Sequence, residues 1–386
     1  MAGLKEYVSW RGDLSFSADP LNEVDLICFS QLAVLDFGGI FKRDITLKEM
    51  FKLYAATGRA TSLLGVMVPY DMNVIFKAMA ESNRFGGVVI KDRVYEYDAE
   101  KILQFGATVY ETRAYRLVCF SGTDDTIIGW QENINLAMPE PVPAQKRAVE
   151  YLTEFCDTPK KLYVFGHSKG GNLSLYSFAN CDSQTASKVT GCYCFDGPGL
   201  REETFTRPEV SERLPRMKTI LPPFSVVGRL FFHEEELFVV KSIQRYLGQH
   251  DCFSWEVVGN RLIKNESGFM RGSDEMEKNI KKLIADTDGC ERDALFESFF
   301  GWLLADGDST LTDLEKKRKN FIAWYMTLPR EEKKIVKSIL TQVIKDSSAR
   351  SFFTDLQKQW KDKKAYELKA LESMKKSIYG KNVPHA

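Results

Sequence analysis

The sequence of 386 residues lacks long apolar runs. No stretch of about 18 consecutive apolar residues occurs, so the sequence predicts no membrane-spanning helix. Its first residues, MAGLKEYVSWRGDLSFS, also lack the basic region and the apolar stretch of about 7 to 15 residues that make up a secretory signal. We therefore expect a cytoplasmic protein with no stable membrane insertion.

Cysteine pairs at the spacing of zinc or redox motifs are also missing. The eight cysteines are scattered, and Cys192 and Cys194 have one residue between them, whereas a C-x-x-C motif has two. Cys119, Cys192 and Cys194 lie inside apolar runs, where a reduced thiol behaves as a small hydrophobic side chain. The sequence therefore predicts neither a metal nor an organic cofactor.

The chain has no net charge overall, with 53 basic and 53 acidic side chains, but its C-terminal part is basic. Residues 311–386 hold 18 Lys and Arg against 9 Asp and Glu. Acidic and apolar residues interleave the lysines of residues 358–381, a pattern that favours a solvated helix face over a nucleic-acid site. We expect no nucleic-acid partner.

The pattern of apolar residues divides the chain into three parts, 1–85, 86–270 and 271–386. Apolar residues recur at helical spacing in the first part, and short β-branched and aromatic runs such as GGVVI and RVYEYD begin the second. The elements predicted next are strand 117–120, helix 143–156, strand 162–165, helix 170–180, and strands 191–195, 225–228 and 238–241. Strands separated by helices favour an α/β fold with a mostly parallel sheet. The third part is predicted to be helical, because residues 335–344 place their apolar side chains on one stripe with lysines opposite.

Ser168 stands between two glycines in the segment VFGHSKGG, residues 164–171. The strand pattern KLYVF precedes it and the helix pattern GNLSLYSFA follows it, which is the strand, turn and helix of a nucleophile elbow. The amide of Lys169 would then lie at a helix N-terminus, where unpaired N–H groups favour a developing negative charge. The alternative is a glycine-rich turn that holds a phosphate, but neither G-x-G-x-x-G nor G-x-x-x-x-G-K-[ST] occurs at this turn.

A second strand and turn, LVCFSGTDDTIIGW, occupies residues 117–130. Acyl transfer needs two N–H donors for the oxyanion, one after the nucleophile and one from an earlier loop after a strand. Thr123 is placed to supply the second donor, so the predicted oxyanion hole consists of Thr123 and Lys169.

With these two motifs, CFSGTDDTIIGWQENINL and LYVFGHSKGGNLS, the chain resembles the class 3, fungal-type lipases and a related bacterial branch of α/β-hydrolases over about residues 20–265. The resemblance implies an α/β-hydrolase with N-terminal and C-terminal helical additions and serine esterase or lipase activity. Two residues differ from the lipases: Ser121 replaces an arginine and Lys169 replaces a leucine. The second change puts a polar residue where the lipases have an apolar one beside the acyl site, which argues against a strongly lipophilic substrate.

The general base must be one of four histidines. We expect His167 to point away from Ser168 and to pack or hydrogen-bond beneath the turn, and His385 lies next to the end of the chain. His233, in FFHEEELF, is predicted in a turn between two apolar strands. His250 follows the last predicted strand of the sheet, where the resembling fold carries its histidine, so His250 is the predicted base and His233 the alternative.

The acid predicted to pair with this histidine is Asp196, which follows strand 191–195 in the segment CYCFDGPGL. The order Ser168, Asp196, His250 is the chain order of α/β-hydrolases. Glu234, Glu235 and Glu236 remain alternatives.

These residues together predict a serine hydrolase that cleaves a small-molecule ester or lipid through an acyl-enzyme on Ser168. The alternative is a catalytically weak interaction module whose helical C-terminus binds a partner.

Overall fold

The structure, a computed structural model, describes residues 2–64, 68–136, 141–270, 310, 325–330, 333 and 364–380. The amphipathic helix predicted at 335–344 and His385 lie outside the described residues. Within the lysine-rich stretch, residues 364–379 form a helix whose side chains are mostly exposed, as expected for a solvated face. Met374 of this helix is buried, and Ile378 packs against the core of the domain.

The centre of the described part is an eight-stranded sheet whose strands follow one another in chain order. Strands β4 to β8 run parallel, whereas β1 to β4 pair antiparallel. The strands are β1 (Ile45–Thr46), β2 (Val89–Asp98), β3 (Leu103–Glu111), β4 (Tyr115–Phe120), β5 (Lys161–His167), β6 (Val189–Phe195), β7 (Met217–Leu221) and β8 (Glu236–Val239). β9 (Val257–Val258) and β10 (Arg261–Leu262) form a separate hairpin.

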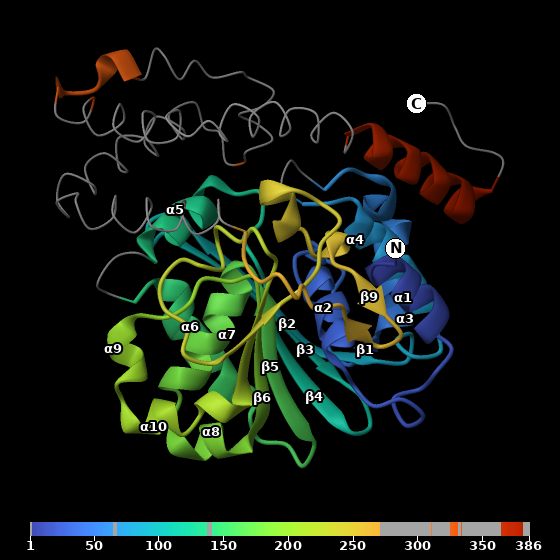
Figure 1. The fold of residues 1–386 in the computed structure, drawn as a ribbon. Helices are drawn as coiled ribbons and strands as arrows, with labels where there is room; N and C mark the ends of the chain where they lie inside the picture. The colour runs from blue at the N-terminus through green and yellow to red at the C-terminus, as the bar shows by residue number, and fades with distance from the viewer. Residues whose placement is uncertain are drawn as a thin grey trace.

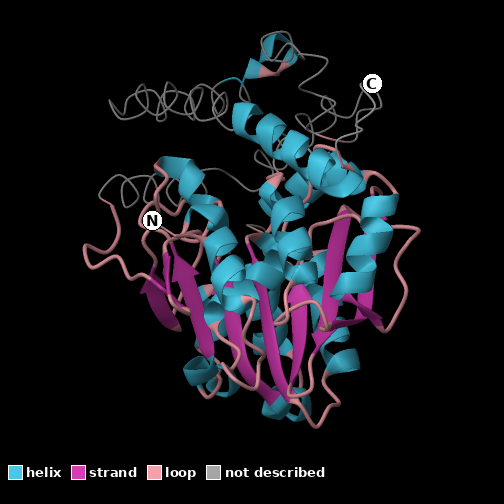
Figure 2. Cartoon of the chain, turned by 90° about the vertical axis from the view of Figure 1, so that its right-hand side faces the viewer, coloured by secondary structure: helices cyan, strands magenta, loops and turns pink. Residues whose placement is uncertain are grey.

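Helices cover both faces of this sheet (Figures 1 and 2). The N-terminal helices lie on one side: α1 (Leu4–Arg11), α2 (Glu23–Leu32), α3 (Leu47–Ala56), η1 (Arg59–Thr61) and α4 (Asp71–Glu81). The later helices lie on the other: α6 (Pro143–Phe155), α7 (Lys169–Asn180), α8 (Ser183–Lys188), α9 (Glu202–Phe205), α10 (Pro208–Ser211) and η2 (Leu214–Arg216). Three short helices remain: α5 (Ile127–Asn135) after β4, and η3 (Tyr246–His250) and η4 (Cys252–Ser254) after β8.

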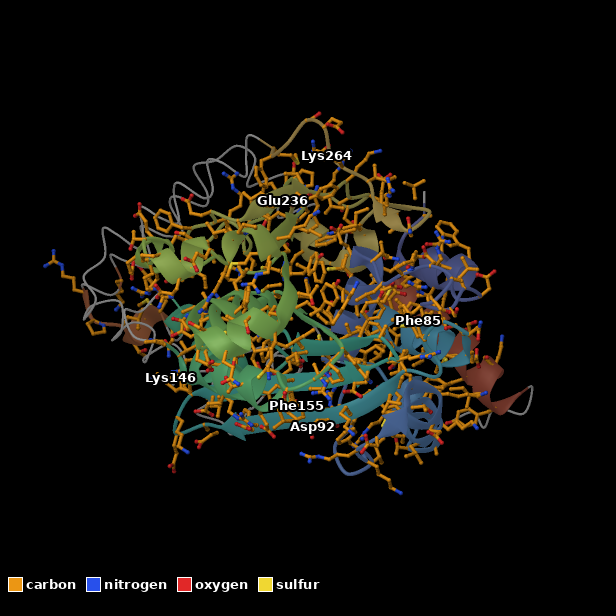
Figure 3. All side chains as sticks on the ribbon, turned by 90° about the horizontal axis from the view of Figure 1, so that it is seen from below. Phe85, Asp92, Lys146, Phe155, Glu236 and Lys264 are labelled. Atoms are coloured by element: carbon orange, nitrogen blue, oxygen red, sulfur yellow. The ribbon has the colours of Figure 1, made fainter. Side chains whose placement is uncertain are left out.

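Side chains fill the space on both sides of the sheet in two buried clusters (Figure 3). Strand β4 shows why one sequence supplies both. Leu117 and Cys119 pack with the N-terminal helices, whereas Val118 and Phe120 pack with α6 and α7, because successive residues of a strand point to opposite faces. A strand buried on both faces therefore has a continuous apolar run, the pattern seen in LVCF at residues 117–120.

Side-chain caps begin two of the N-terminal helices. The Asn22 side chain accepts hydrogen bonds from the amides of Val24 and Asp25 at the start of α2. At the start of α3, Thr46 and Glu49 each accept a hydrogen bond from the other's backbone amide. Such reciprocal caps satisfy the N–H groups that a helix leaves unpaired, and they fix where it begins.

The predicted α/β class, with a mostly parallel sheet and N-terminal helices, is confirmed, and the C-terminal part contains the helix at 364–379. The strands predicted at 117–120, 162–165, 191–195 and 238–241 correspond to β4, β5, β6 and β8, and the two predicted helices to α6 and α7. The division at residues 85 and 270 stays a prediction. None of the described helices is both long and apolar enough to cross a membrane.

The prediction of a strand at 225–228 was wrong. The strand here is β7, at Met217–Leu221, and the following Pro222 and Pro223 end it, because proline has no N–H to donate to a neighbouring strand. The apolar residues Val226 and Val227 lie instead in the loop between β7 and β8. Strand β3 was missed in the sequence.

Candidate active site

Ser168 occupies the turn between β5 and α7, and its backbone has φ +58° and ψ −127°. A positive φ is unusual for a residue with a side chain and indicates a backbone held by its surroundings. Those surroundings are close: a Cβ atom at Gly170 would lie 2.2 Å from the carbonyl oxygen of Phe120, at the end of β4. Glycine at position 170 therefore allows the turn to press against the neighbouring strand.

Asp196 follows β6 and has the same unusual backbone sign, with φ +45°. Its carboxylate is 1% exposed and accepts a hydrogen bond from each side. His250 Nδ1 donates to Oδ2 at 2.6 Å, and the Ser225 hydroxyl donates to Oδ1. These bonds replace the water that a buried carboxylate loses, and they hold it toward the His250 ring.

His250 ends the short helix η3 and is 30% exposed, so part of its ring faces solvent. The segment before it is held by Gln249, whose backbone oxygen accepts a hydrogen bond from the Trp255 ring nitrogen at 2.8 Å. The Gln249 side chain accepts another from the Phe224 amide at 2.7 Å. The His250 ring is thus fixed both through its own Nδ1 and through its neighbour in the chain.

The sheet places Ser168 next to Asp196. β5 and β6 are parallel with His167 paired to Phe195, and the Ser168 amide donates to the Phe195 oxygen at 2.9 Å. Among the described residues, no hydrogen bond joins the Ser168 hydroxyl to His250. Such contacts are often loose in structures without substrate and tighten when it binds.

His167 makes a hydrogen bond, one of the two roles expected from the sequence. Its Nε2 donates to the backbone oxygen of His250 at 2.9 Å, and the two rings lie 4.7 Å apart at 34°. Burial, together with the neighbouring charge of His250, lowers the pKa of His167 to about 3. The ring of His167 is therefore neutral near pH 7, and it supports His250.

The two residues of the predicted oxyanion hole lie on either side of this turn. Thr123 follows β4, where a Cβ atom at the adjacent Gly122 would lie 3.6 Å from the Ser168 Cβ. Lys169 begins α7, so its amide is one of the unpaired N–H groups at the helix N-terminus. The Lys169 side chain, expected beside the acyl site, is instead 1% exposed and directed to β3 and α5. The Lys169 side chain therefore gives no argument against a lipophilic substrate.

The alternative histidine and acids lie elsewhere. His233 Nδ1 donates to Glu235 at 2.6 Å, and His233 Nε2 donates to the Gly228 oxygen at 2.6 Å. Burial alone would raise the pKa of Glu235, but the hydrogen bonds and charge of His233 and the Thr219 hydroxyl hold it below its ordinary value. Glu234 and Glu236 are exposed. The structure thus pairs Asp196 with His250, and Glu235 with His233.

Two contributors to the site were not found in the sequence, Ser225 and His167. Ser225 reaches Asp196 across 29 positions of chain, and no local pattern marks it. His167 was recognised as part of the elbow, but its contact with His250 depends on how the loop after β8 folds back.

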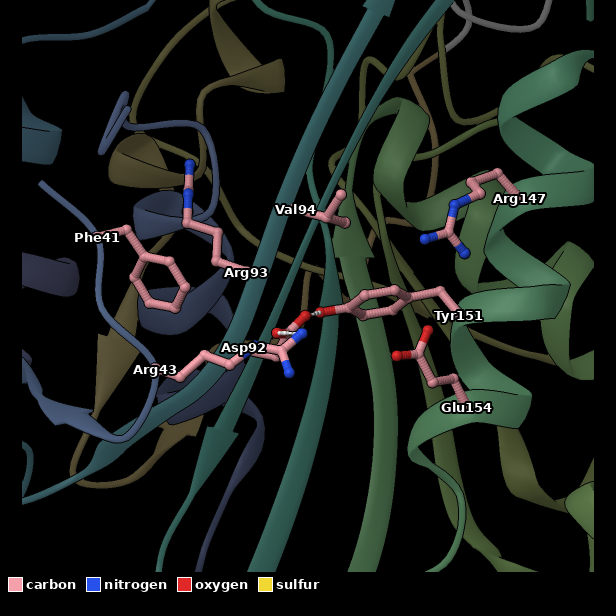
Figure 4. Close-up of a pocket in the computed structure, with 8 residues that line it drawn as sticks. All are labelled: Phe41, Arg43, Asp92, Arg93, Val94, Arg147, Tyr151 and Glu154. Carbon is pink, nitrogen blue, oxygen red and sulfur yellow. Dashed lines mark hydrogen bonds and ion pairs between the residues drawn. The ribbon is translucent and has the colours of Figure 1, made fainter. Parts of the chain in front are cut away.

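None of the predicted site residues lines either of two cavities in the described part of the chain. The larger, of about 360 Å³, lies between β2, α6 and the loop before β1 (Figure 4). Its buried carboxylate, Asp92, is already paired with Arg43 at 2.7 Å and with the Tyr151 hydroxyl at 2.9 Å. The smaller, of about 200 Å³, is lined by residues of α7 and of the loop after β6, among them Asn172 and Gly199.

Groups of His, Cys, Asp and Glu that could hold a metal ion are absent from the described residues. The seven cysteines among them are all buried and free, in line with their apolar surroundings in the sequence. Burial raises the pKa of Cys119, Cys192 and Cys194 well above that of an ordinary thiol. These thiols therefore stay protonated near pH 7 and act as core side chains.

Comparison with known proteins gives three results. No curated protein matches the chain. Among solved structures, the chain is similar to the crystal structure of M37 lipase, with 14% identity, a TM-score of 0.34, and coverage of 53% of this chain and 67% of that one. A family model described as Mbeg1-like matches residues 79–301, more than half of the sequence, and the matched segment includes every residue of the predicted site. The chain belongs to the Mbeg1-like family.

Proposed function

We propose that this protein is a serine hydrolase that cleaves a carboxylic ester or acyl substrate through an acyl-enzyme on Ser168. The observation that carries the proposal is the 2.6 Å hydrogen bond from His250 to the buried Asp196, at the edge of the sheet that also holds the Ser168 turn. Nucleophile, acid and base follow one another in the chain order of α/β-hydrolases, and both Ser168 and Asp196 have a positive φ.

The hydrogen bond to Asp196 determines which ring nitrogen of His250 carries the proton. Because a carboxylate only accepts, the His250 proton sits on Nδ1, and Nε2 is left with the lone pair that a general base needs. Among the described residues, no hydrogen bond occupies that nitrogen. The partly exposed ring can therefore take the hydroxyl proton of Ser168 once substrate binding brings the two side chains within hydrogen-bond distance.

The covalent steps follow from these positions. Ser168 Oγ forms a bond to the acyl carbon while its proton moves to His250, and the oxyanion is held by the amides of Thr123 and Lys169. The bond to the leaving group then breaks, and His250 returns the proton to the departing oxygen. Water then attacks the acyl carbon in the same way while His250 takes its proton. The bond to Ser168 Oγ breaks, His250 returns the proton to Ser168, and the carboxylic acid is released.

The proposal is tested with a fluorophosphonate probe, which reacts only with an activated serine. We expect the wild type to be labelled at a single site and the Ser168→Ala variant to remain unlabelled. Ser187→Ala serves as the matched control, because Ser187 is exposed and its hydroxyl binds only a local backbone oxygen. Absence of labelling in the wild type, or equal labelling of Ser168→Ala, would contradict the proposal.

A further inference from the structure

We propose that helix α5 positions the oxyanion hole, with Glu132 holding the segment that carries the Lys169 amide and Asn133 holding Thr123. This inference rests on the proposed function and adds positioning residues to it. Neither Glu132 nor Asn133 touches the reacting atoms in this scheme. Both act through the two residues whose backbone amides bind the oxyanion.

The first contact is a buried ion pair. Lys169 Nζ donates to the carboxylate of Glu132, to the backbone oxygen of Gln104 at 2.6 Å and to the Gln104 side-chain oxygen at 3.1 Å. An ammonium group has three protons, and these three acceptors use all of them. The two charged side chains are 1% and 0% exposed, so neither is stabilised by solvent.

Glu132 is itself held from two further sides. One of its oxygens accepts a hydrogen bond from the Gln104 amide at 3.0 Å, and the other accepts one from the Ala144 amide at 2.9 Å. The carboxylate therefore connects β3, the first turn of α6 and the first residue of α7. Burial lowers the pKa of Lys169, while the charge of Glu132 raises it, so the lysine depends on this carboxylate to stay charged.

The second contact comes from the next residue of the same helix. Asn133 Nδ2 donates to Thr123 Oγ1 at 2.6 Å. The helix can approach this closely because residue 129 is glycine: a Cβ atom there would lie 3.0 Å from the Thr123 methyl group and 3.2 Å from the Gln104 side-chain oxygen. Consecutive side chains of α5 thus reach the two residues whose amides must converge on one oxygen atom.

This arrangement explains the replacement of leucine by lysine after the nucleophile. An apolar side chain at position 169 would only fill space, whereas the ammonium group has a directional, charged partner on α5. A buried ion pair is a poor source of net stability, because desolvation opposes it, but it tolerates few alternative geometries. Positional accuracy is what an oxyanion hole requires, since its donors must lie about 2.7 to 3.1 Å from the developing charge.

The test uses Thr123, whose partly exposed side chain is replaced without leaving a buried charge. Thr123→Val keeps the backbone amide and the side-chain shape but removes the oxygen that Asn133 binds, and Thr123→Ser keeps the oxygen. Asn133→Ala removes the partner. We expect Thr123→Val and Asn133→Ala each to lower kcat for a nitrophenyl ester by about 10- to 100-fold with little change in KM, as for weakened oxyanion stabilisation.

A trifluoromethyl ketone forms a tetrahedral oxyanion with the active serine, so its affinity measures oxyanion stabilisation. A residue that only stabilises the fold would not change this affinity. The affinity of the ketone should fall by the same factor as kcat, Thr123→Ser should restore both, and the double variant should lose no more than either single variant. Asn83→Ala is the matched control, because the exposed Asn83 side chain binds only the backbone oxygen of Asp13. Thermal unfolding of each variant checks that it is folded.

The inference is overturned if Thr123→Val and Asn133→Ala leave kcat and inhibitor affinity within about twofold of the wild type, or if the effects of the two substitutions simply add. A wild type that takes no fluorophosphonate at Ser168 overturns the proposed function itself. The probe experiment is therefore performed first, and the two failures are distinguishable.

Discussion

The described part of the molecule contains two histidine–carboxylate pairs of the same length, and they differ in what surrounds the ring. His250 and Asp196 are joined at 2.6 Å, as are His233 and Glu235. The His250 side chain is 30% exposed, whereas that of His233 is 7% exposed, and the second ring nitrogen of His233 donates to the Gly228 oxygen.

A short hydrogen bond to a carboxylate therefore does not by itself make a histidine a general base. A histidine that takes a proton from a serine needs a free lone pair, and that lone pair must be within reach of substrate. Both ring nitrogens of His233 are already engaged by oxygen atoms, one of Glu235 and one of Gly228, so neither is open to a serine hydroxyl. We infer that the His233 pair fixes the loop between β7 and β8, and that the His250 pair performs the chemistry.

The largest effect is expected when His250 and His233 are replaced by glutamine in two separate variants. His250→Gln should lower kcat/KM for a nitrophenyl ester by about 10⁴-fold, because the proton acceptor is lost. His233→Gln should stay within about tenfold of the wild type, since it changes only loop packing. Ester hydrolysis by both purified variants measures this contrast, and equal losses would show that the two pairs are not functionally different.

The second prediction concerns the stability that the His233–Glu235 pair gives to the fold. Glu235 is 0% exposed, so His233→Ala leaves a buried carboxylate without its hydrogen-bond partner, and we expect the free energy of unfolding to fall by about 3 kcal/mol. Urea unfolding of His233→Ala measures this loss. The double variant His233→Ala with Glu235→Gln removes the charge as well and should recover part of it. No recovery would mean that packing, rather than the unpaired charge, causes the loss.

The smallest effect concerns His167, a ring beside His250 that has no counterpart at His233. The unfolded chain binds a proton at this residue near pH 6.5, and the folded chain only near pH 3. Between these values the unfolded state holds more protons, so stability is complete above pH 6.5 and falls as the pH drops toward 3. At about pH 5 the expected cost is about 2 kcal/mol.

Urea unfolding at about pH 7.5 and about pH 5 measures this dependence. His167→Gln cannot be protonated, so its loss of stability between the two pH values should be smaller than that of the wild type by up to about 2 kcal/mol. Identical losses in the two proteins would show that the His167 ring accepts a proton without disturbing the fold.

Much of the fold could be predicted because its signals are local. The runs at 162–165 and 192–195 are apolar throughout, which is typical of strands buried on both faces, and α6 and α7 follow their helical periodicity. Strand β3 could not be recognised as readily, because polar Gln104 and Thr108 and the small Gly106 and Ala107 interrupt its apolar pattern. The error at 225–228 has the same origin, since Val226 and Val227 look like a strand unless the two prolines before them are given their full weight.

In the candidate site, too, local features could be predicted from the sequence and long-range contacts could not. Ser168 and its turn were marked by glycines, a strand and a helix within 20 residues of chain, and Thr123 by its place after β4. The side-chain contacts of Lys169 could not be predicted, because Gln104 and Glu132 lie 65 and 37 positions away. The role of His167 also depended on a distant loop.

From the sequence alone we could derive the α/β class, the strand, turn and helix around Ser168, and the few histidines and acids that could form a pair. Periodicity and turn chemistry are properties of neighbouring residues, so they can be read directly along the chain. Which histidine meets which acid depends on contacts between distant segments, so it follows only from the tertiary structure. The segment after β8 brings His250 to Asp196, 54 positions before it in the chain, whereas Glu235 bonds the histidine two positions before it.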